Sequence, residues 1–410
     1  MPKLFQINIT ANWGSHGKIT EGIGQMVQSN GWESYIAYGR WFNESSSHLY
    51  HIGSDLDEKI HGLSTRILDN HGLMSRRATR RLVHYIESIQ PDIIHLHNIH
   101  GYYLNYPILF DFLSSYNKPV VWTLHDCWAY TGHCAHYMFA GCEKWKSHCA
   151  DCPQKSAYPR SFLRDNSYRN FEKKRAAFSS LNSLVLVPVS RWLDGELQSS
   201  FLKDIDRRLV YNGIDSSTFH IAEDTDAIKQ RYHIPPRNKM ILGVASNWYH
   251  KGLGDFIKLS RRIGEGYSVV LVGLNQKELK SLPKGVIGIR RTENVKELCK
   301  LYSAANVLFN PTWEDNFPTI NLEAMACGTP VVTYATGGAA ESIDSLTGAA
   351  IERGDLAAAI NKIQNFCQAP KSRFSTPCRK RTEEHFTDHE MCKNYFQLYQ
   401  ELLSGNTSGR

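Results

Sequence analysis

Short runs of aliphatic and β-branched residues recur along the chain, and each is followed by a longer stretch of mixed polar character. One series lies at residues 3–9, 92–98, 120–126 and 184–190, and a second lies at 240–246, 267–273, 306–311 and 330–335. Buried strands that alternate with helical stretches are typical of parallel sheets covered by helices. The pattern therefore predicts an α/β fold.

The break between the two series divides the chain. It contains Asn212-Gly213, a turn signal, and 410 residues exceed what a single core usually organises. We expect a first domain at residues 1–211, a second at 212–388 and a terminal segment at 389–410. The terminal segment predicts a helix, because one face of it would carry Met391, Tyr395, Leu398, Tyr399 and Leu402.

Composition is that of a soluble globular chain, with 42% hydrophobic and 21% charged residues. No apolar run is long enough to span a bilayer, and the opening residues MPKLFQINIT lack the regions of a signal peptide. We expect a cytoplasmic protein, or one attached peripherally to the cytoplasmic face of the inner membrane. The net charge of +7 suits anionic small molecules or a membrane surface. Nucleic acid is not an expected partner, because the basic residues are dispersed and accompany no recognition motif.

The segment from Trp313 to Val332 carries the most informative chemistry. It reads WEDNFPTINLEAMACGTPVV, with Asp315 and Glu323 on either side of Pro318, a residue favoured at the start of a helix. Backbone N–H groups at a helix start can hold a pyrophosphate, and here they would belong to Thr319, Ile320 and Asn321.

The two acids can complete a nucleotide-sugar site. Glu323 lies about one turn further along, by the ~3.6-residue period, where its carboxylate can accept hydrogen bonds from ribose hydroxyls. Asp315 precedes the helix and can reach the sugar beyond the phosphates. The alternative is an ordinary helix, started by Pro318 and stopped by Gly328, with both acids solvated.

This segment resembles the E-x7-E signature of the retaining glycosyltransferases of glycosyltransferase family 4. Asp315 stands in place of the first glutamate and Pro318 in place of a usual glycine, and both departures bear on the donor sugar. The resemblance implies the GT-B architecture: two Rossmann-like domains facing a cleft, the first binding the acceptor and the second binding the nucleotide-sugar. It also implies that the terminal helix packs back on the first domain.

The same resemblance implies a reaction. A hexose would pass from a UDP- or GDP-sugar to an acceptor hydroxyl with retention of configuration, by front-face attack in which the leaving phosphate takes the proton. Catalysis would then consist mostly of positioning and charge stabilisation, and no metal is expected at the reaction centre.

Two positions of the first domain match the family. Gly14 and Gly17 follow the first predicted strand and would let the backbone approach a phosphate or sugar, where the family places a glycine loop against the donor sugar. The alternative is a plain strand-to-helix turn. His125 matches the family's strand-end histidine, which contacts the donor hexose near its reacting carbon, although a lone histidine is more often structural.

In the second domain, Lys251-Gly252 matches the family's basic motif, and Lys251 would stabilise the diphosphate of the leaving group. Ser246 replaces the arginine of that motif, and Arg290, Arg291, Asn247 and His250 are candidates to supply a second donor. The candidate catalytic residues are therefore His125, Lys251 and Asp315. The candidate donor-binding residues are Gly14, Lys251, Asp315, Phe317, Pro318, Thr319, Ile320 and Glu323.

Three further histidines, His95, His97 and His100, lie in the run DIIHLHNIHGYY. The first two share a face of the predicted strand and have a spacing that could hold a metal. We favour a role in the acceptor pocket or in packing.

Five of the ten cysteines fall between residues 127 and 152, within an insertion expected at residues 127–160. Disulfides are rare in the cytoplasm, and Cys149-x-x-Cys152 has the spacing of a zinc knuckle. We expect one structural zinc, with Cys127 left as a buried thiol and with His133, His136 or His148 as possible replacements for one thiolate. The expected ligands are Cys134, Cys142, Cys149 and Cys152. Unliganded thiols are the alternative.

The insertion, the following YPRSFLRDNS and a Lys173-Lys174 pair resemble bacterial exopolysaccharide and O-antigen transferases of the colanic-acid type. In that setting the acceptor would be an oligosaccharide on a polyprenyl diphosphate. A helix carrying Arg76, Arg77, Arg80 and Arg81 could dock its anionic headgroup or the membrane surface, or could be a solvated face over the core.

Two other functions fit some of these features. A nucleotide-sugar epimerase can share the GT-B fold, and it would need acid-base carboxylates and no acceptor. A non-catalytic, zinc-containing module that binds a sugar nucleotide would account for Ser246 and Asp315 as signs of a decayed transferase.

Overall fold

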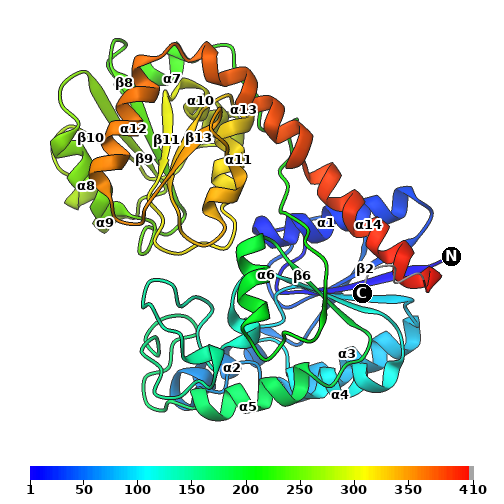
Figure 1. Ribbon diagram of the computed structural model, residues 1–410. Helices are drawn as coiled ribbons and strands as arrows, with labels where there is room; N and C mark the ends of the chain where they lie inside the picture. The colour runs from blue at the N-terminus through cyan, green and yellow to red at the C-terminus, as the bar shows by residue number, and fades with distance from the viewer. Residues whose placement is uncertain (406–410) are drawn as a thin grey trace. The chain divides into compact units, whose positions relative to one another are not determined.

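Parallel strands organise the computed structural model, which describes residues 1–405 (Figure 1). The chain forms two compact units, one made of Met1–Tyr211 with the segment that starts at Met391, and one made of Asn212–Glu390. Each unit contains one sheet, and the paired strands of both sheets run parallel. The α/β class predicted from the alternating pattern is confirmed.

The first unit has a seven-stranded sheet whose order reverses at its first strand. The order is β3-β2-β1-β4-β5-β6-β7, so β1 pairs with β2 on one side and with β4 on the other. Ligands of open parallel sheets bind beyond the carboxyl ends of the strands at such a reversal. The strands are β1 (Lys3–Asn8), β2 (Glu33–Tyr38), β3 (His48–His51), β4 (Ile93–Leu96), β5 (Val120–Leu124), β6 (Leu184–Pro188) and β7 (Asp206–Arg207).

Helices cover both faces of this sheet (Figure 1). Three of them begin with side-chain caps, in which Ser54, Asn105 and Ser190 accept backbone N–H groups of the first turn. The helices are α1 (Gly14–Ser29), α2 (Asp55–Leu68), α3 (Arg76–Ile89), α4 (Tyr106–Tyr116), α5 (Ser167–Phe178), α6 (Arg191–Gln198) and α14 (Asp388–Ser404), with short 3-10 turns η1 (Trp128–Tyr130) and η2 (Lys144–Lys146).

The terminal helix α14 packs on the first unit, as expected. Its apolar face joins the core formed by α1 and the sheet, through Met391, Cys392, Tyr395, Leu398 and Tyr399. Two of these side chains also make buried hydrogen bonds: the hydroxyl of Tyr395 lies 2.8 Å from Thr123 Oγ1, and that of Tyr399 lies 2.6 Å from His95 Nδ1. The predicted segment 389–410 extends beyond the described residues at 406–410.

The second unit has a six-stranded sheet of order β10-β9-β8-β11-β12-β13, which reverses at β8. Its core includes Ile241, Leu271, Phe309 and Val332 from the sheet and Phe256 from a covering helix. The strands are β8 (Lys239–Val244), β9 (Tyr267–Val272), β10 (Val286–Ile289), β11 (Val307–Asn310), β12 (Val331–Tyr334) and β13 (Gly348–Ile351). The helices are α7 (Asp226–Arg231), α8 (Leu253–Arg262), α9 (Gln276–Ser281), α10 (Val295–Ala304), α11 (Thr319–Ala326), α12 (Leu356–Gln368), α13 (Ser372–His385) and the 3-10 turn η3 (Ala339–Ser342).

The eight strands predicted from apolar runs are all present, and five others were not predicted. Four of these five, β3, β7, β10 and β13, are the outermost strands of the two sheets. An edge strand is covered less completely than a central one, so its sequence is less uniformly apolar. The fifth, β2, begins with the polar pair Glu33-Ser34.

The Asn212-Gly213 turn lies where a close approach of two chain segments requires glycine. A Cβ atom at Gly213 would meet the carbonyl oxygen of Thr387 at 2.2 Å. An isolated bridge joins Ile214 to Thr387 at the same place. The two segments that connect the units therefore lie side by side.

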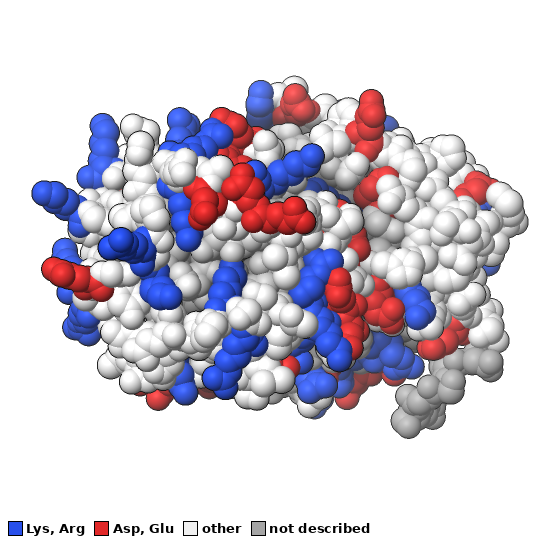
Figure 2. Space-filling model, turned by 90° about the horizontal axis from the view of Figure 1, so that it is seen from above, with Lys and Arg blue, Asp and Glu red and all other residues white. Residues whose placement is uncertain are grey.

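Charged side chains are interspersed on the face shown in Figure 2, where basic and acidic residues alternate over short distances. Among residues 1–405, no helix has both the length and the apolar character needed to cross a bilayer.

The first unit buries many imidazoles. The pKa values of six of them lie below the usual 6.5, with burial as the largest cause: His16, His61, His71, His95, His97 and His125. A neutral imidazole is therefore the folded form of each at neutral pH.

Replacing His61 by glutamine should flatten the pH dependence of stability. The folded pKa of His61 is about 3, against 6.5 when it is unperturbed, so the unfolded chain binds more protons as the pH falls below 6.5. The free energy of unfolding should then fall by about 1.4 kcal/mol per pH unit for this group alone, a loss that is absent above that pH. Chemical denaturation between about pH 4 and pH 8 measures the slope.

The matched control is His84→Gln, because His84 lies on α3 with a side chain that is 79% exposed. It should leave the slope unchanged. Equal slopes for His61→Gln and the parent would contradict the assignment of His61 as a buried neutral group.

Candidate active site

The helix after β11 begins one residue later than expected. Pro318 is the extended residue before α11, with φ −72° and ψ 114°, and Thr319 is the first helical residue. The amide of Asn321 donates to the Pro318 carbonyl at 3.2 Å, which corrects its expected role in holding an anion. Thr319 and Ile320 therefore supply the amides of the helix start.

Both acids of the segment are half-buried and bonded to other side chains. Glu323 Oε2 accepts from the Tyr302 hydroxyl at 2.8 Å, and its other oxygen lies 3.4 Å from Thr319 Oγ1. Asp315 Oδ2 lies 2.6 Å from Lys251 Nζ, with the two side chains 21% and 31% exposed. The structure thus differs from the simple alternative in which both acids are solvated.

Lys251 lies in the turn before α8 and is oriented by three acceptors. Its ammonium donates to Asp315 Oδ2 at 2.6 Å, to the Glu314 carbonyl at 2.9 Å and to Thr312 Oγ1 at 3.4 Å. The next residue, Gly252, has φ +80°, and a Cβ atom there would meet the Pro311 carbonyl oxygen at 2.4 Å. Glycine is thus required at position 252 by the close packing of this turn against the residues after β11.

Phe317 shapes this loop through its backbone and its ring. Its amide donates to Asp315 Oδ1 at 3.2 Å, and the buried ring packs on Phe386 with centroids 5.8 Å apart.

An acid that the sequence pattern did not single out lies beside these residues. Glu314 is buried, and its Oε1 lies 2.5 Å from Nδ1 of His250, which is also buried. The adjacent Asp315 matched the eight-residue spacing to Glu323, whereas the partner of Glu314 is 64 positions away. The one sequence signal for Glu314 is its position directly before Asp315.

The expected substitutes for the missing arginine lie in different settings. His250 Nδ1 is bonded to Glu314 Oε1, and Asn247 Oδ1 accepts a hydrogen bond from the amide of Tyr249 at 3.1 Å. Arg290 and Arg291 are exposed after β10, the edge strand of the sheet. Ser246 is exposed at the end of β8.

In the first unit, three imidazoles meet beyond the carboxyl ends of neighbouring strands. His16 lies in the first turn of α1, His97 follows β4 and His125 follows β5. His97 Nδ1 lies 3.3 Å from His125 Nε2, and the rings of His16 and His125 have centroids 4.7 Å apart. Burial lowers the pKa of His125 well below 6.5, and the neighbouring His16 and His97 lower it further. His16 was not among the sequence candidates.

The two loop glycines have different reasons to be glycine. Gly14 starts α1 with φ +66°, and no other atom lies within 4 Å of the position of its Cβ atom. At Gly17 a Cβ atom would meet Thr10 Oγ1 at 2.8 Å, so this glycine serves the packing of α1 on the preceding loop. Gly14 is the one that leaves open space beside the backbone.

The other strand-end histidines have structural partners. His95 Nε2 lies 2.8 Å from Thr123 Oγ1, and His100 Nε2 lies 2.8 Å from Asp126 Oδ2. His97 Nε2 lies 3.2 Å from Gln6 Oε1. In residues 1–405, no group of three or more His, Cys, Asp or Glu residues is arranged so that it could hold a metal ion.

The four arginines of α3 are exposed and divide between two hollows. Arg76 and Arg80 line one of about 660 Å³ between α3, α4 and α5, where Lys173 adds a third cation. Arg77 and Arg81 line another of about 520 Å³ beside Tyr50 and other residues of β3 and α2. Leu82 and Ile86 form the buried face of the same helix.

The four expected zinc ligands line one small cavity of about 10 Å³, together with His133 and Trp145. Hydrogen bonding with Cys134 lowers the pKa of the Cys152 thiol below its usual value. Burial raises the pKa of the Cys149 thiol. Cys127, expected as a separate thiol, is buried.

Two buried polar groups border this cavity or lie near its thiols. His133 Nδ1 lies 2.6 Å from Asp69 Oδ1, whereas its buried Nε2 makes no hydrogen bond within the described part of the chain. Lys174 Nζ donates to the carbonyls of Trp128 and Thr131 at 2.6 and 2.9 Å. Burial lowers the pKa of Lys174 to about 7, opposed by the nearby Cys149 and Cys134.

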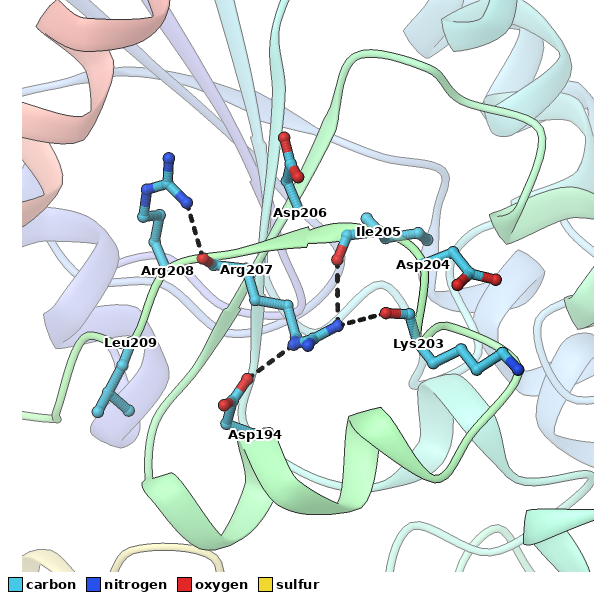
Figure 3. Close-up of a pocket in the computed structure, with 8 residues that line it drawn as sticks. All are labelled: Asp194, Lys203, Asp204, Ile205, Asp206, Arg207, Arg208 and Leu209. Carbon is cyan, nitrogen blue, oxygen red and sulfur yellow. Dashed lines mark hydrogen bonds and ion pairs between the residues drawn. The ribbon is translucent and has the colours of Figure 1, made fainter. Parts of the chain in front are cut away.

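A polar hollow at the edge strand β7 does not join the strand-end groups. Figure 3 shows Arg207 reaching across it, with Nε 2.8 Å from Asp194 Oδ1 and Nη1 2.7 Å from the Lys203 carbonyl. Arg207 and Asp194 are thus paired with each other, and we assign the hollow no ligand.

Solved structures of glycosyltransferases share this fold. Sucrose-phosphate synthase from Thermosynechococcus elongatus aligns with a TM-score of 0.72 and 18% identity, over 99% of this chain and 100% of that one. Anabaena Alr3699/HepE in complex with UDP aligns with a TM-score of 0.68 and 14% identity, over 98% and 100%. The two parallel sheets with their covering helices therefore have the GT-B fold.

Two family models assign the chain more closely. Residues 28–218 match Glycosyltransferase Family 4, and residues 238–369 match Glycosyl transferases group 1. The putative colanic acid biosynthesis glycosyl transferase WcaC of Escherichia coli is 26% identical over 326 residues, which are 76% of this chain and 77% of that protein. The capsular polysaccharide biosynthesis glycosyltransferase CapM of Staphylococcus aureus is 24% identical over 47% of this chain and 53% of its own. The chain is therefore a glycosyltransferase of the family 4 and group 1 type.

Proposed function

We propose that this protein is a retaining hexosyltransferase that moves a sugar from a UDP- or GDP-sugar to a hydroxyl of a lipid-linked oligosaccharide in surface polysaccharide biosynthesis. One observation carries the donor part of the proposal. Asp315, the start of α11 and Glu323 lie on one loop and helix of the second unit, where Lys251 pairs with Asp315 and Tyr302 donates to Glu323.

The nucleotide would bind along α11. The amides of Thr319 and Ile320 at the helix start can donate to an anion, which suits a diphosphate. Glu323 is a half-buried carboxylate held in place by Tyr302, and carboxylate oxygens accept more than one hydrogen bond. Ribose hydroxyls are the natural donors to such a group.

The Lys251–Asp315 pair would bind the reacting part of the donor. The ammonium offers positive charge to the diphosphate, and the carboxylate accepts from sugar hydroxyls. In front-face retention the bond from the anomeric carbon to the phosphate oxygen breaks, and a bond from that carbon to the acceptor oxygen forms on the same face. The acceptor proton moves to the leaving phosphate, so the protein supplies positioning and charge stabilisation.

The relatives support the substrate class and the pathway class. HepE has been solved with UDP and with UDP-glucose, which favours a nucleotide-sugar donor. WcaC and CapM carry names of exopolysaccharide and capsule biosynthesis, which favours a growing surface polysaccharide as acceptor.

Substitution of Glu323 by glutamine should weaken donor binding about 10- to 100-fold, because a charged acceptor of ribose hydroxyls is lost.

Lys251→Met should lower kcat by about 10²- to 10³-fold, because the ammonium that would stabilise the leaving diphosphate is lost. Thermal shift with UDP-, GDP-, ADP- and dTDP-sugars identifies the donor, and single-turnover transfer measures kcat. Glu265→Gln, an exposed acid of the same unit, is the control. Turnover by both variants at the parent rate would refute this donor site.

The acceptor's lipid diphosphate, or the anionic surface that carries it, would dock on α3. Its four arginines are exposed, and none forms an ion pair with a carboxylate within residues 1–405. The hollow that holds Arg76 and Arg80 also has apolar lining from Pro107, Ile108 and Leu73. Cations beside apolar groups suit an anionic, lipid-bearing ligand.

Reversal of Arg76 and Arg80 to glutamate should weaken binding to liposomes of anionic phospholipid by about tenfold or more, because each basic residue near such a surface contributes about 1 kcal/mol. Cosedimentation at two salt concentrations measures it. The control is the double reversal of Arg261 and Arg262, exposed at the end of α8. Unchanged liposome binding of the α3 variant would argue against docking by this helix.

The cysteine insertion is proposed to hold a structural zinc. Four thiols share one cavity, and the buried Nε2 of His133 borders it while Asp69 holds the other ring nitrogen. A carboxylate behind a histidine is the usual second partner of a metal-binding imidazole. Zinc with four thiolates, or with three thiolates and His133, carries a net negative charge, and the nearby ammonium of Lys174 would offset it. The loop would have to close around the ion, because these groups are not yet arranged as ligands.

Elemental analysis of the purified chain should find about one zinc per molecule. Cys149→Ser and Cys152→Ser should lose the zinc and lower the melting temperature, while Cys367→Ser, in a buried site of the second unit, should retain the zinc. Less than about half an equivalent, with the insertion thiols freely titratable, would leave the alternative of unliganded thiols.

A further inference from the structure

Hydrogen bonds in the first unit determine which nitrogen of His97 carries its proton. Gln6 Nε2 donates to the Thr20 carbonyl at 2.8 Å, and this bond orients the amide because a carbonyl oxygen can only accept. Gln6 Oε1 therefore faces His97 Nε2, 3.2 Å away. Since Oε1 can only accept, the hydrogen of a neutral His97 is on Nε2.

The tautomer of His97 determines that of the neighbouring His125. A neutral imidazole has one N–H group, so His97 Nδ1 is an acceptor. His125 Nε2 lies 3.3 Å from that atom and must be the donor. His125 then carries its hydrogen on Nε2, and its Nδ1 is the acceptor nitrogen, whichever group it meets.

We propose that Gln6 and His97 are positioning residues that fix the tautomer of His125, so that this strand-end imidazole presents an acceptor nitrogen to a sugar hydroxyl. The assignment rests on the proposed function only for the hydroxyl. The tautomer itself follows from contacts within the first unit.

The ring of the adjacent His16 packs beside that of His125, with centroids 4.7 Å apart. His16 Nδ1 lies 3.0 Å from the amide nitrogen of Asn98. A hydroxyl can donate to the acceptor nitrogen of His125, whereas an ionised phosphate cannot.

Burial keeps the rings neutral, which the argument requires. It lowers the pKa of His97 well below 6.5 and that of His16 to about 4. The stack is also held from behind, because His97 packs on His95 with centroids 3.9 Å apart and His95 is bonded to Tyr399 of α14. A ring flip of His97 would break both its bond to Gln6 and its bond to His125.

Two other buried histidines provide internal controls of the opposite tautomer. His61 Nε2 accepts the amide of Gly72 at 3.1 Å, and His71 Nε2 accepts the amide of Gly101 at 3.1 Å. A backbone amide can only donate, so both rings carry their hydrogen on Nδ1. Neither control involves Gln6 or His97.

The test is a long-range ¹H–¹⁵N spectrum of histidine-labelled, full-length protein at neutral pH without donor, which distinguishes the two tautomers directly. His97 and His125 should have their hydrogen on Nε2, and His61 and His71 should have it on Nδ1. Gln6→Leu removes the acceptor and should move the His97–His125 pair to the other or a mixed tautomer, with both controls unchanged. Gln6→Glu keeps an oxygen acceptor and should retain the parent tautomers.

The Gln6→Leu variant should bind the donor about tenfold more weakly than the parent, because His125 no longer keeps its acceptor nitrogen in place. Gln25→Leu, the same substitution on the exposed side of α1, should bind like the parent. A parent His125 with its hydrogen on Nδ1 overturns the proposal, as do unchanged tautomers in Gln6→Leu. The parent spectrum decides even if that variant does not fold. Because the spectrum needs no donor, predicted tautomers in a protein that turns over no nucleotide-sugar would refute the proposed function alone.

Discussion

Parallel strand pairing is the constraint on which both candidate binding regions depend. When neighbouring strands run the same way, the residues that follow them meet at one edge of the sheet. In the first unit this brings together the residues after β1, β4 and β5, where His16, His97 and His125 lie. In the second unit it brings the turn after β8 against the loop after β11, and this contact places Lys251 beside Asp315.

The close approach of those two segments explains several residues at once. The carbonyl oxygen of Pro311 leaves no room for a side chain at Gly252, and the short turn that results aims Lys251 at the loop. The loop then satisfies the ammonium with one carboxylate and two further oxygens. Such pairing offsets the cost of partly removing these charges from water. The close packing at Gly252 and the ion pair of Lys251 thus both result from the contact between this turn and the loop after β11.

The sequence predicted the parts of this arrangement that depend on local pattern. The central strands other than β2, the helix after residue 318 and the apolar face of α14 follow from periodicity and from proline and glycine signals. The partners of the acids did not follow, because Tyr302 is 21 positions from Glu323 and His250 is 64 positions from Glu314. Edge strands were missed because their burial is incomplete. The amide of Asn321 was misjudged because a single turn bond to Pro318 depends on backbone angles that residue types do not determine.

The two units differ in the kind of polarity that they present at their strand ends. At the strand ends of the second unit the polar groups are charged and partly exposed, as Lys251, Asp315 and Glu323 show. A diphosphate is itself charged, so its binding needs charge and helix amides that compete with water. At the strand ends of the first unit the polar groups are imidazoles whose burial lowers their pKa values and keeps them neutral. Sugar hydroxyls are neutral and directional, and for them the position of one hydrogen on each ring determines recognition more than charge does.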